Sequence, residues 1–201
     1  MQKPVVTFSS QIDFFKAWLK HPLRVGTFTQ SSRFLAESLV KPINFHKAKC
    51  IVELGSGTGN VTKKIIEKMA PDCLLFCLEI DTRLVNRMKR QIIDERVRII
   101  EDSAENFPSY LNEGGFKKAD YILSGLPITS LPKQLTRKIL NLSIENLNEN
   151  GCFIQLQYSP VRKKELKKFF PAVKVNFVPL NIPPAFVFVC KRTSKFINAV
   201  D

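Results

Sequence analysis

The sequence predicts an α/β fold built around a parallel, Rossmann-like sheet, and two observations lead to this prediction. The stretch 51–60, I-V-E-L-G-S-G-T-G-N, begins as an apolar run, breaks into glycines and continues into a segment with helical periodicity. Two further apolar runs, 73–78 and 97–100, are each followed at once by acidic residues. Strand, glycine turn and helix in this order are typical of the first crossover of a nucleotide-binding sheet.

The glycines of this turn stand at every second position, as Gly55, Gly57 and Gly59. Glycine suits a place where the backbone turns tightly and a ligand lies close to it, because no Cβ is in the way. The spacing G-x-G-x-G differs from the G-x-G-x-x-G of dinucleotide enzymes. A purely structural turn is the alternative interpretation.

Acidic residues follow the second and third predicted strands. Glu79 lies twenty residues after Gly59, where a doubly wound fold places an acid that accepts hydrogen bonds from ribose hydroxyls. The alternative is that Glu79 caps the next helix, which Asp81 could do equally well. Asp102 places a carboxylate beside the same crevice at the end of the third strand.

The motifs E-L-G-S-G-T-G, L-E-I-D and E-D-S-A, in this order, resemble the class I S-adenosylmethionine-dependent methyltransferases over roughly residues 45–192. The resemblance implies a seven-stranded sheet of order 3-2-1-4-5-7-6 with strand 7 antiparallel. It also implies S-adenosylmethionine as cofactor and S-adenosylhomocysteine as product. In the family the glycine loop lies under the methionine part, the acid after strand two holds the ribose and the acid after strand three meets the adenine amine. The cofactor-binding residues implied by position are Glu53, Gly55, Ser56, Gly57, Gly59, Glu79, Ile80, Asp102, Ser103, Ala104 and Ser124.

Composition limits the remaining possibilities. The 201 residues suffice for one domain with a full core, and 44% hydrophobic with 24% charged residues is ordinary for a globular protein. No apolar run approaches the roughly 18 residues that span a bilayer, and we expect no signal peptide. The net charge of +13 favours a polyanionic partner, either nucleic acid or an anionic membrane surface.

The five cysteines lie in or beside apolar strands, and none forms a C-x-x-C pair. We therefore expect buried thiols in a reducing cytoplasm, with neither a metal site nor a disulfide. They are Cys50, Cys73, Cys77, Cys152 and Cys190.

We divide the chain into an N-terminal helical segment (1–44), a core (45–192) and a tail (193–201). An amphipathic helix is predicted from Ser9 or Ser10 to Pro22, with bulky aromatic residues on one side and cations at its border. Such a helix suits the surface of an anionic bilayer and could also cover the active site; packing on the domain is the alternative. The predicted membrane contacts are Phe14, Phe15, Lys16, Trp18, Leu19, Lys20 and Arg24.

Beyond the third strand we predict a loop over 107–118, a strand over 119–123, a helix over 133–148, a fifth strand ending near Tyr158, a basic helix over 162–168 and a hairpin of 173–178 with 185–190. The basic helix is either a solvated face or a contact for phosphates. In the loop of the hairpin, Leu180 and Ile182, with Phe186 beside it, could meet acyl chains or fold inward.

The segment after the fourth strand, S-G-L-P-I-T-S-L-P, decides the substrate in this family. Base-modifying amino-group methyltransferases usually carry Asn or Asp first and an aromatic after the proline. Here Ser124 and Ile128 stand in those places, so a stacking ring for a flipped base is missing. The segment instead resembles the bacterial phospholipid N-methyltransferases. So do H-P-L-R-V-G-T-F-T-Q-S-S-R-F-L-A near the N-terminus and I-Q-L-Q-Y-S-P at strand five.

This resemblance implies methyl transfer to the amine of phosphatidylethanolamine, in a cytoplasmic protein peripherally bound to the inner face of the membrane. The mechanism we expect is direct in-line displacement with water excluded, without a metal. Ser124 and Tyr158 are the candidate catalytic residues that orient the amine, with Gly125, Leu126 and Pro127 as substrate-binding residues. No dedicated base is evident, because His21 and His46 both lie outside the expected site.

Two alternatives stay open. An RNA adenine dimethyltransferase is favoured by the charge and the glycine loop. It is disfavoured by Ser124 and Ile128, and because the chain leaves no room for the extra helical domain of those enzymes. A non-catalytic lipid- or RNA-binding module is disfavoured because the glycines and both acids are intact. Oligomeric state and the number of methyl groups transferred are left undetermined.

Overall fold

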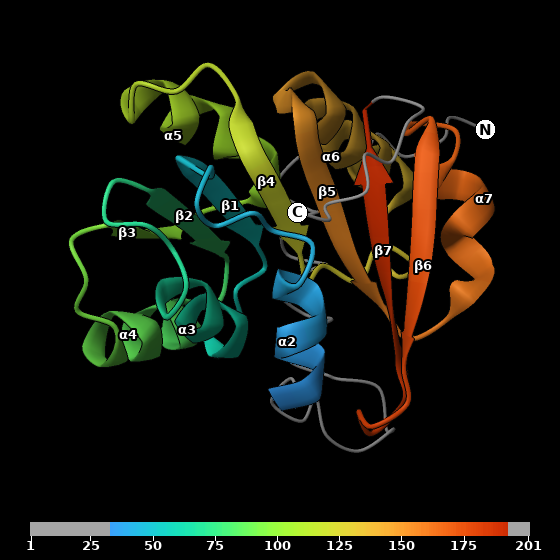
Figure 1. Ribbon diagram of the computed structural model, residues 1–201, viewed down its shortest axis with the longest axis horizontal. Coiled ribbons are helices and arrows are strands. Elements are labelled where there is room, and N and C mark those ends of the chain that lie inside the picture. The colour runs from blue at the N-terminus through green and yellow to red at the C-terminus, as the bar shows by residue number, and fades with distance from the viewer. Residues whose placement is uncertain (1–32, 193–201) are drawn as a thin grey trace, which may run out of the picture.

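The computed structural model describes residues 33–192, which form a seven-stranded sheet with helices on both faces (Figure 1). The strands are β1 (Cys50–Leu54), β2 (Leu74–Glu79), β3 (Val97–Glu101), β4 (Ala119–Ser124), β5 (Leu147–Gln157), β6 (Ala172–Val178) and β7 (Ala185–Lys191). The α-helices are α2 (Arg33–Val40), α3 (Asn60–Ile66), α4 (Thr82–Gln91), α5 (Phe107–Glu113), α6 (Lys133–Glu145) and α7 (Lys163–Leu166). Two 3₁₀ turns are η1 (Ala104–Asn106) and η2 (Pro160–Arg162).

The strand order is β3-β2-β1-β4-β5-β7-β6, which confirms the predicted topology. Neighbours from β3 to β5 are parallel, and β7 is antiparallel to both β5 and β6. Because β5 and β6 both run opposite to β7, they run in the same direction. The carboxyl ends of all strands except β7 therefore lie along one edge of the sheet, where open α/β sheets bind their ligands.

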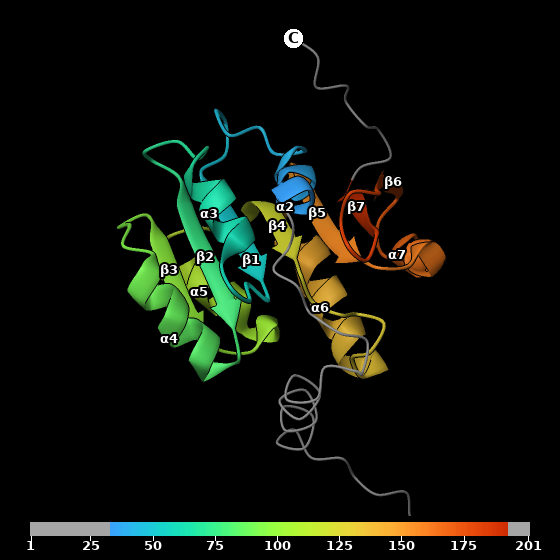
Figure 2. The ribbon, with the colours of Figure 1, turned by 90° about the horizontal axis from the view of Figure 1, so that it is seen from below.

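Two apolar layers hold the helices on the sheet. One lies under α5, α6 and α7 and contains the stacked rings of Phe153 and Phe170, whose centroids are 5.2 Å apart. The other lies under α2, α3 and α4. The view from below shows α2 and α6 on opposite sides of β4 and β5 (Figure 2).

Helix α2 packs into the second of these layers. Its residues Leu35, Leu39 and Val40 are buried with Ile51 of β1. The division at residue 44 stays a prediction, and the predicted membrane-contact helix lies outside the described residues. Between residues 33 and 192, none of the helices has the length and apolar character needed to cross a bilayer.

The prediction of a loop over 107–118 was wrong, because α5 occupies its first half. Phe107 and Leu111 are fully buried and fix this short helix on the sheet. Pro108 stands in its first turn, where the missing N–H costs nothing, so the proline does not prevent a helix there.

Three other boundaries differ from expectation. Helix α6 ends at Glu145, and β5 begins earlier than predicted, at Leu147, which pairs with Ala119 before a register shift. The basic segment is helical only over Lys163–Leu166, after η2. The hairpin of β6 and β7 and the buried, unpaired state of the five cysteines are as predicted.

Candidate functional site

The loops that follow β1, β2, β3 and β4 are joined by backbone hydrogen bonds along one edge of the sheet. The N–H of Gly55 donates to Leu78 O at 2.8 Å, and that of Gly125 donates to Leu54 O at 2.9 Å. The N–H of Asp102 donates to Glu79 O at 3.1 Å. The predicted site residues at these four strand ends are therefore brought together as the topology requires.

Glu79 is buried among these loops. Its Oε2 accepts the N–H of Gly57 at 2.9 Å, and its Oε1 accepts the N–H groups of Ile80 and Asp81 at 2.8 and 3.0 Å. Burial raises the pKa of this carboxyl above its ordinary value, and the three backbone donors oppose that rise. Asp81, not Glu79, caps α4 by accepting from Arg83 N, so the alternative role for Glu79 is already filled.

The glycine loop needs its glycines for two different reasons. Gly55, Gly57 and Gly59 all have positive φ, which other residues rarely adopt. A Cβ on Gly55 would also lie 2.8 Å from Leu126 Cδ2, so the loops after β1 and β4 approach closely at this point. A Cβ on Gly57 would meet nothing within 4 Å. The loop is thus packed on one side and open at its middle glycine.

Asp102 is held by a residue that sequence reasoning did not identify. Its Oδ2 accepts the hydroxyl of Tyr110 at 2.8 Å, and its Oδ1 accepts from Ser103 N and from Asn106 Nδ2. This hydrogen bond raises the pKa of Tyr110 to about 12, so the phenol stays protonated and keeps donating. Ala104, two residues after Asp102 in the sequence, is buried at the start of η1.

Glu53 turns into the protein. Its Oε2 accepts the hydroxyl of Thr62 at 2.6 Å and lies 3.6 Å from Cys77 Sγ, so it ties β1 to α3 and β2. Burial raises the pKa of Glu53 to about 7, and the hydrogen bonds from Thr62 and Cys77 oppose this rise. Ser56 is likewise buried, and its hydroxyl donates to Leu78 O at 3.4 Å. Direct cofactor contact by these two side chains stays a prediction.

Gln155 of β5 fixes the turn after β4. The side chain is fully buried, and its Nε2 donates to Ser124 O at 3.2 Å and to Leu126 O at 2.9 Å. The Oε1 of Gln155 is buried and accepts no hydrogen bond within the described residues. The amide therefore acts as a donor that holds two carbonyl oxygens of the turn.

These contacts leave one carbonyl of the turn available. Leu126 O also accepts from Ile128 N, and Pro127 O accepts from Ser130 N and Leu131 N. Gly125 O accepts no hydrogen bond from the part of the chain that the structure describes, and Gly125 is exposed. Its oxygen therefore retains the capacity to accept a hydrogen bond.

The two candidate catalytic residues occupy different positions. Ser124 is buried, and its Oγ accepts Leu126 N at 3.4 Å, so its hydroxyl supports the turn. Ser124 pairs with Gln155 on the neighbouring strand. Tyr158 comes three residues after Gln155 and therefore lies farther toward the carboxyl edge of the sheet. Tyr158 is partly exposed, and burial of the rest of its side chain raises the pKa of its phenol. Tyr158 is thus a protonated phenol at neutral pH and cannot act there as a base.

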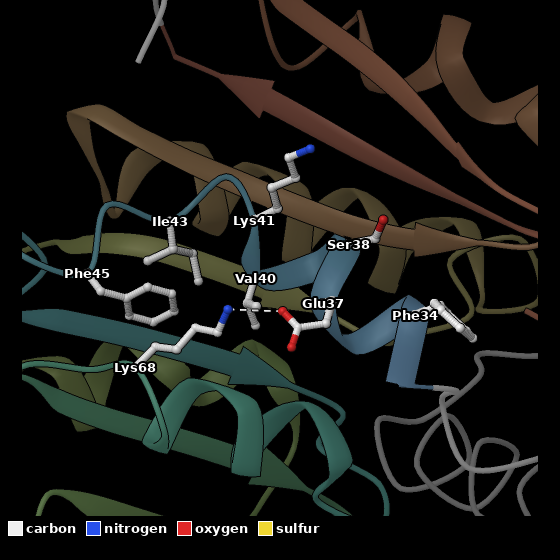
Figure 3. Close-up of a pocket in the computed structure, with 8 residues that line it drawn as sticks. All are labelled: Phe34, Glu37, Ser38, Val40, Lys41, Ile43, Phe45 and Lys68. Carbon is white, nitrogen blue, oxygen red and sulfur yellow. Dashed lines mark hydrogen bonds and ion pairs between the residues drawn. The ribbon is translucent and has the colours of Figure 1, made fainter. Parts of the chain in front are cut away.

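A separate pocket of about 380 Å³ lies between α2, the segment leading to β1 and the end of α3 (Figure 3). Across the pocket, Lys68 Nζ donates a hydrogen bond to the carboxylate of Glu37 at 3.0 Å. The predicted site residues do not line this pocket, so it is distinct from the candidate site at the strand ends. Its lining residues are Phe34, Glu37, Ser38, Val40, Lys41, Ile43, Phe45 and Lys68.

Sequence reasoning missed Tyr110 and Gln155 for different reasons. Tyr110 stands eight residues after Asp102 and reaches it only because 107–113 is helical. Gln155 is a polar residue inside an apolar strand, and this interruption of the run I-Q-L-Q was the available signal.

Both the sequence and the fold of this chain are similar to those of known methyltransferases. Residues 27–166 match the family described as ribosomal RNA adenine dimethylase. The chain is 31% identical over 180 residues to ornithine lipid N-methyltransferase of Singulisphaera acidiphila, covering 89% of this chain and 94% of that protein. It is 35% identical over 136 residues to ribosomal RNA small subunit methyltransferase A of Mesomycoplasma hyopneumoniae, covering 68% of this chain and 47% of that protein. The chain thus spans about half the length of this second relative.

Solved structures show the same fold at low identity. The 1,6-didemethyltoxoflavin-N1-methyltransferase of Burkholderia thailandensis, solved with its substrate and S-adenosylhomocysteine, has a TM-score of 0.67 and 14% identity, over 96% of this chain and 93% of that one. A putative rRNA methylase from Clostridium thermocellum has a TM-score of 0.60 and 17% identity, over 84% of this chain and 100% of that one.

The first prediction concerns Glu53. Because its folded-state pKa lies above the unfolded value, its contribution to stability is fully present below about pH 4.5 and is lost as pH rises to about 7. Replacing Glu53 with Gln removes this pH dependence while keeping an oxygen that can accept from Thr62. In urea unfolding, the stability of Glu53→Gln relative to the native protein should rise by about 2–3 kcal/mol between pH 4.5 and pH 8. A constant difference across this range would contradict the assignment.

The second prediction concerns Gln155. Replacing it with Met keeps the volume but removes the donor to the carbonyl oxygens of Ser124, Leu126 and Leu156, which should cost about 1–3 kcal/mol of unfolding free energy. Gln157→Met is the matched control, because Gln157 is a buried glutamine on the same strand and face. We expect the control to lose less than about 1 kcal/mol. Equal losses in urea unfolding would show that Gln155 has no special role in fixing the turn.

Proposed function

The chain belongs to the class I S-adenosylmethionine-dependent methyltransferases, within the family described as ribosomal RNA adenine dimethylase, and we propose that it methylates the amine of a membrane lipid. The cofactor is S-adenosylmethionine. We propose phosphatidylethanolamine as the acceptor. Ornithine lipid is the second lipid to test, since a relative of matched length is named for it.

The strand ends fit this cofactor. The open middle of the glycine loop at Gly57 leaves room for a ligand against the backbone. Glu79 Oε2 has a single backbone donor, so it retains capacity to accept from a ribose hydroxyl. Asp102 Oδ2 accepts only from Tyr110 within the described residues and can accept an adenine amine as well. We assign these roles to Gly57, Glu79 and Asp102, with Ile80, Ser103 and Ala104 beside them.

When bound, S-adenosylmethionine supplies a methyl group on a sulfonium, which is a good leaving group. The turn Ser124–Pro127 then has to orient a neutral amine toward the glycine loop, and Gly125 O can accept one N–H of that amine. The phenol of Tyr158, at the carboxyl edge of the sheet, can form a second hydrogen bond to that amine. The proton lost by the substrate ammonium goes to water, because neither Ser124 nor Tyr158 is a base at neutral pH.

The observation that carries the lipid proposal is the turn itself. The position after its proline is Ile128, whose side chain is buried beneath the turn, so the turn presents no ring on which a flipped base could stack. Identity to the lipid-modifying relative over nearly the whole length of both chains supports the same conclusion. We propose that the reaction takes place at the inner membrane surface.

RNA is the second candidate acceptor. This candidate is favoured by the family description, by the similarity to a ribosomal RNA methyltransferase and by the net charge of +13. That relative is about twice the length of the aligned region, so its activity does not transfer to this chain without a test.

We predict that the protein transfers labelled methyl groups from S-adenosylmethionine to phosphatidylethanolamine in vesicles that also contain phosphatidylglycerol. Parallel reactions contain ornithine lipid or total RNA, and excess S-adenosylhomocysteine serves as the control for cofactor-dependent transfer. Label in ornithine lipid alone would keep the lipid proposal and change the headgroup. Label in RNA alone would overturn the lipid proposal.

A further inference from the structure

The loop between β6 and β7, residues 179–184, carries apolar side chains into solvent; we call it the tip. Leu180 is 63% exposed and Ile182 is 82% exposed, although both are large apolar residues. At the base of the tip, Phe177 is 57% exposed and packs against Phe186, with ring centroids 5.1 Å apart. Contiguous exposed apolar residues of this kind mark interaction surfaces.

The tip is held in shape by its own polar residue. Asn181 is buried, and its Nδ2 donates to Pro183 O at 2.7 Å. Leu180 and Ile182, on either side of Asn181, are the exposed large apolar residues of the loop. The exposure of the two apolar side chains is thus built into the loop.

The tip lies on the edge of the sheet that carries the site. Gln157 at the end of β5 pairs with Phe186, and Phe186 pairs with Phe177, so the three residues form one row across the strands. Tyr158 therefore lies level with the base of the tip, and residues 179–184 extend beyond it. Figure 1 shows this loop projecting past the end of β5.

Lysines follow β5 on the edge of the sheet that carries the tip. Val161, which is 78% exposed, comes shortly after β5, and the exposed Lys163 and Lys164 begin α7 there. Glu165 is the sole acidic residue of the sequence between 158 and 192. Lys174, Lys191 and Arg192 lie toward the opposite edge, where β6 begins and β7 ends.

Exposed apolar side chains with cations on the same edge of the sheet match the two layers of an anionic bilayer surface, acyl chains below and phosphates above. RNA would use the cations but gains nothing from Leu180 and Ile182, whose side chains neither stack nor form hydrogen bonds. We propose that the tip inserts Leu180 and Ile182 into the headgroup region of an anionic bilayer and thereby holds the strand-end site against the lipid surface. The inference deepens the proposed function, on which it rests for the identity of the acceptor.

Insertion is tested on the full chain with an environment-sensitive fluorophore on a single introduced cysteine. The five native cysteines are buried, so Ile182→Cys offers the accessible thiol among the described residues. Ile93→Cys is the matched control, because Ile93 is 94% exposed and follows α4 at the opposite edge of the sheet. With vesicles of phosphatidylethanolamine and phosphatidylglycerol, we expect a blue-shifted, brighter emission from position 182 and none from position 93. Binding with no change at position 182 would overturn the proposal.

Affinity is tested by sedimentation with the same vesicles. The double variant Leu180→Ser with Ile182→Ser should bind at least about tenfold more weakly, because it removes the apolar area available for burial. Ile93→Ser should bind like the native protein. Undiminished binding of the double variant would overturn the proposal, as would equal loss of binding to labelled RNA in the same variant. Insertion without methyl transfer to lipid would leave this inference standing and refute the proposed function instead.

Discussion

The site depends on the buried carboxylate of Glu79. Removing a carboxylate from water is costly, and here the three backbone N–H groups of Gly57, Ile80 and Asp81 replace part of its hydration. One of these donors belongs to the glycine loop and the others to the end of β2. The same interaction that makes burial of the acid tolerable therefore fixes the loop after β1 in place. Gly57 holds this loop with a positive φ, which residues other than glycine rarely adopt.

A second constraint fixes the turn after β4. The turn after β4 approaches the glycine loop so closely that neither Gly55 nor Gly125 has room for a Cβ; on Gly125 it would lie 2.8 Å from Gly55 O. Gln155 holds this turn by two of its carbonyl oxygens and leaves the carbonyl of Gly125 open. The cofactor half and the acceptor half of the site are thus adjacent but supported separately, one by Glu79 and the other by Gln155.

The positions of Glu79 and Asp102 could be predicted because each follows an apolar run, and the sheet order could be predicted from the family resemblance that these motifs carry. The contacts within the site could not. Tyr110 reaches Asp102 through a short helix that is stabilised by burial of Phe107 and Leu111, and such tertiary packing leaves no distinct local signal in the sequence. The inward turn of Glu53 depends in the same way on Thr62 of a neighbouring helix. The exposure of Leu180 and Ile182 could not be predicted either, because apolar residues in a loop can equally fold inward, as the buried Asn181 between them does.

The most direct test of this account is a calorimetric titration of S-adenosylhomocysteine into the native protein and into Glu79→Gln. The amide has nearly the size of the carboxylate but offers one acceptor oxygen in place of two. We predict that the variant binds the ligand roughly 10- to 100-fold more weakly, because a charge-assisted acceptor and the fixed glycine loop are lost together. Glu37→Gln, which changes a carboxylate that pairs with Lys68 away from the strand ends, should bind like the native protein. Equal affinity of the native protein and Glu79→Gln would contradict the central role assigned to this carboxylate.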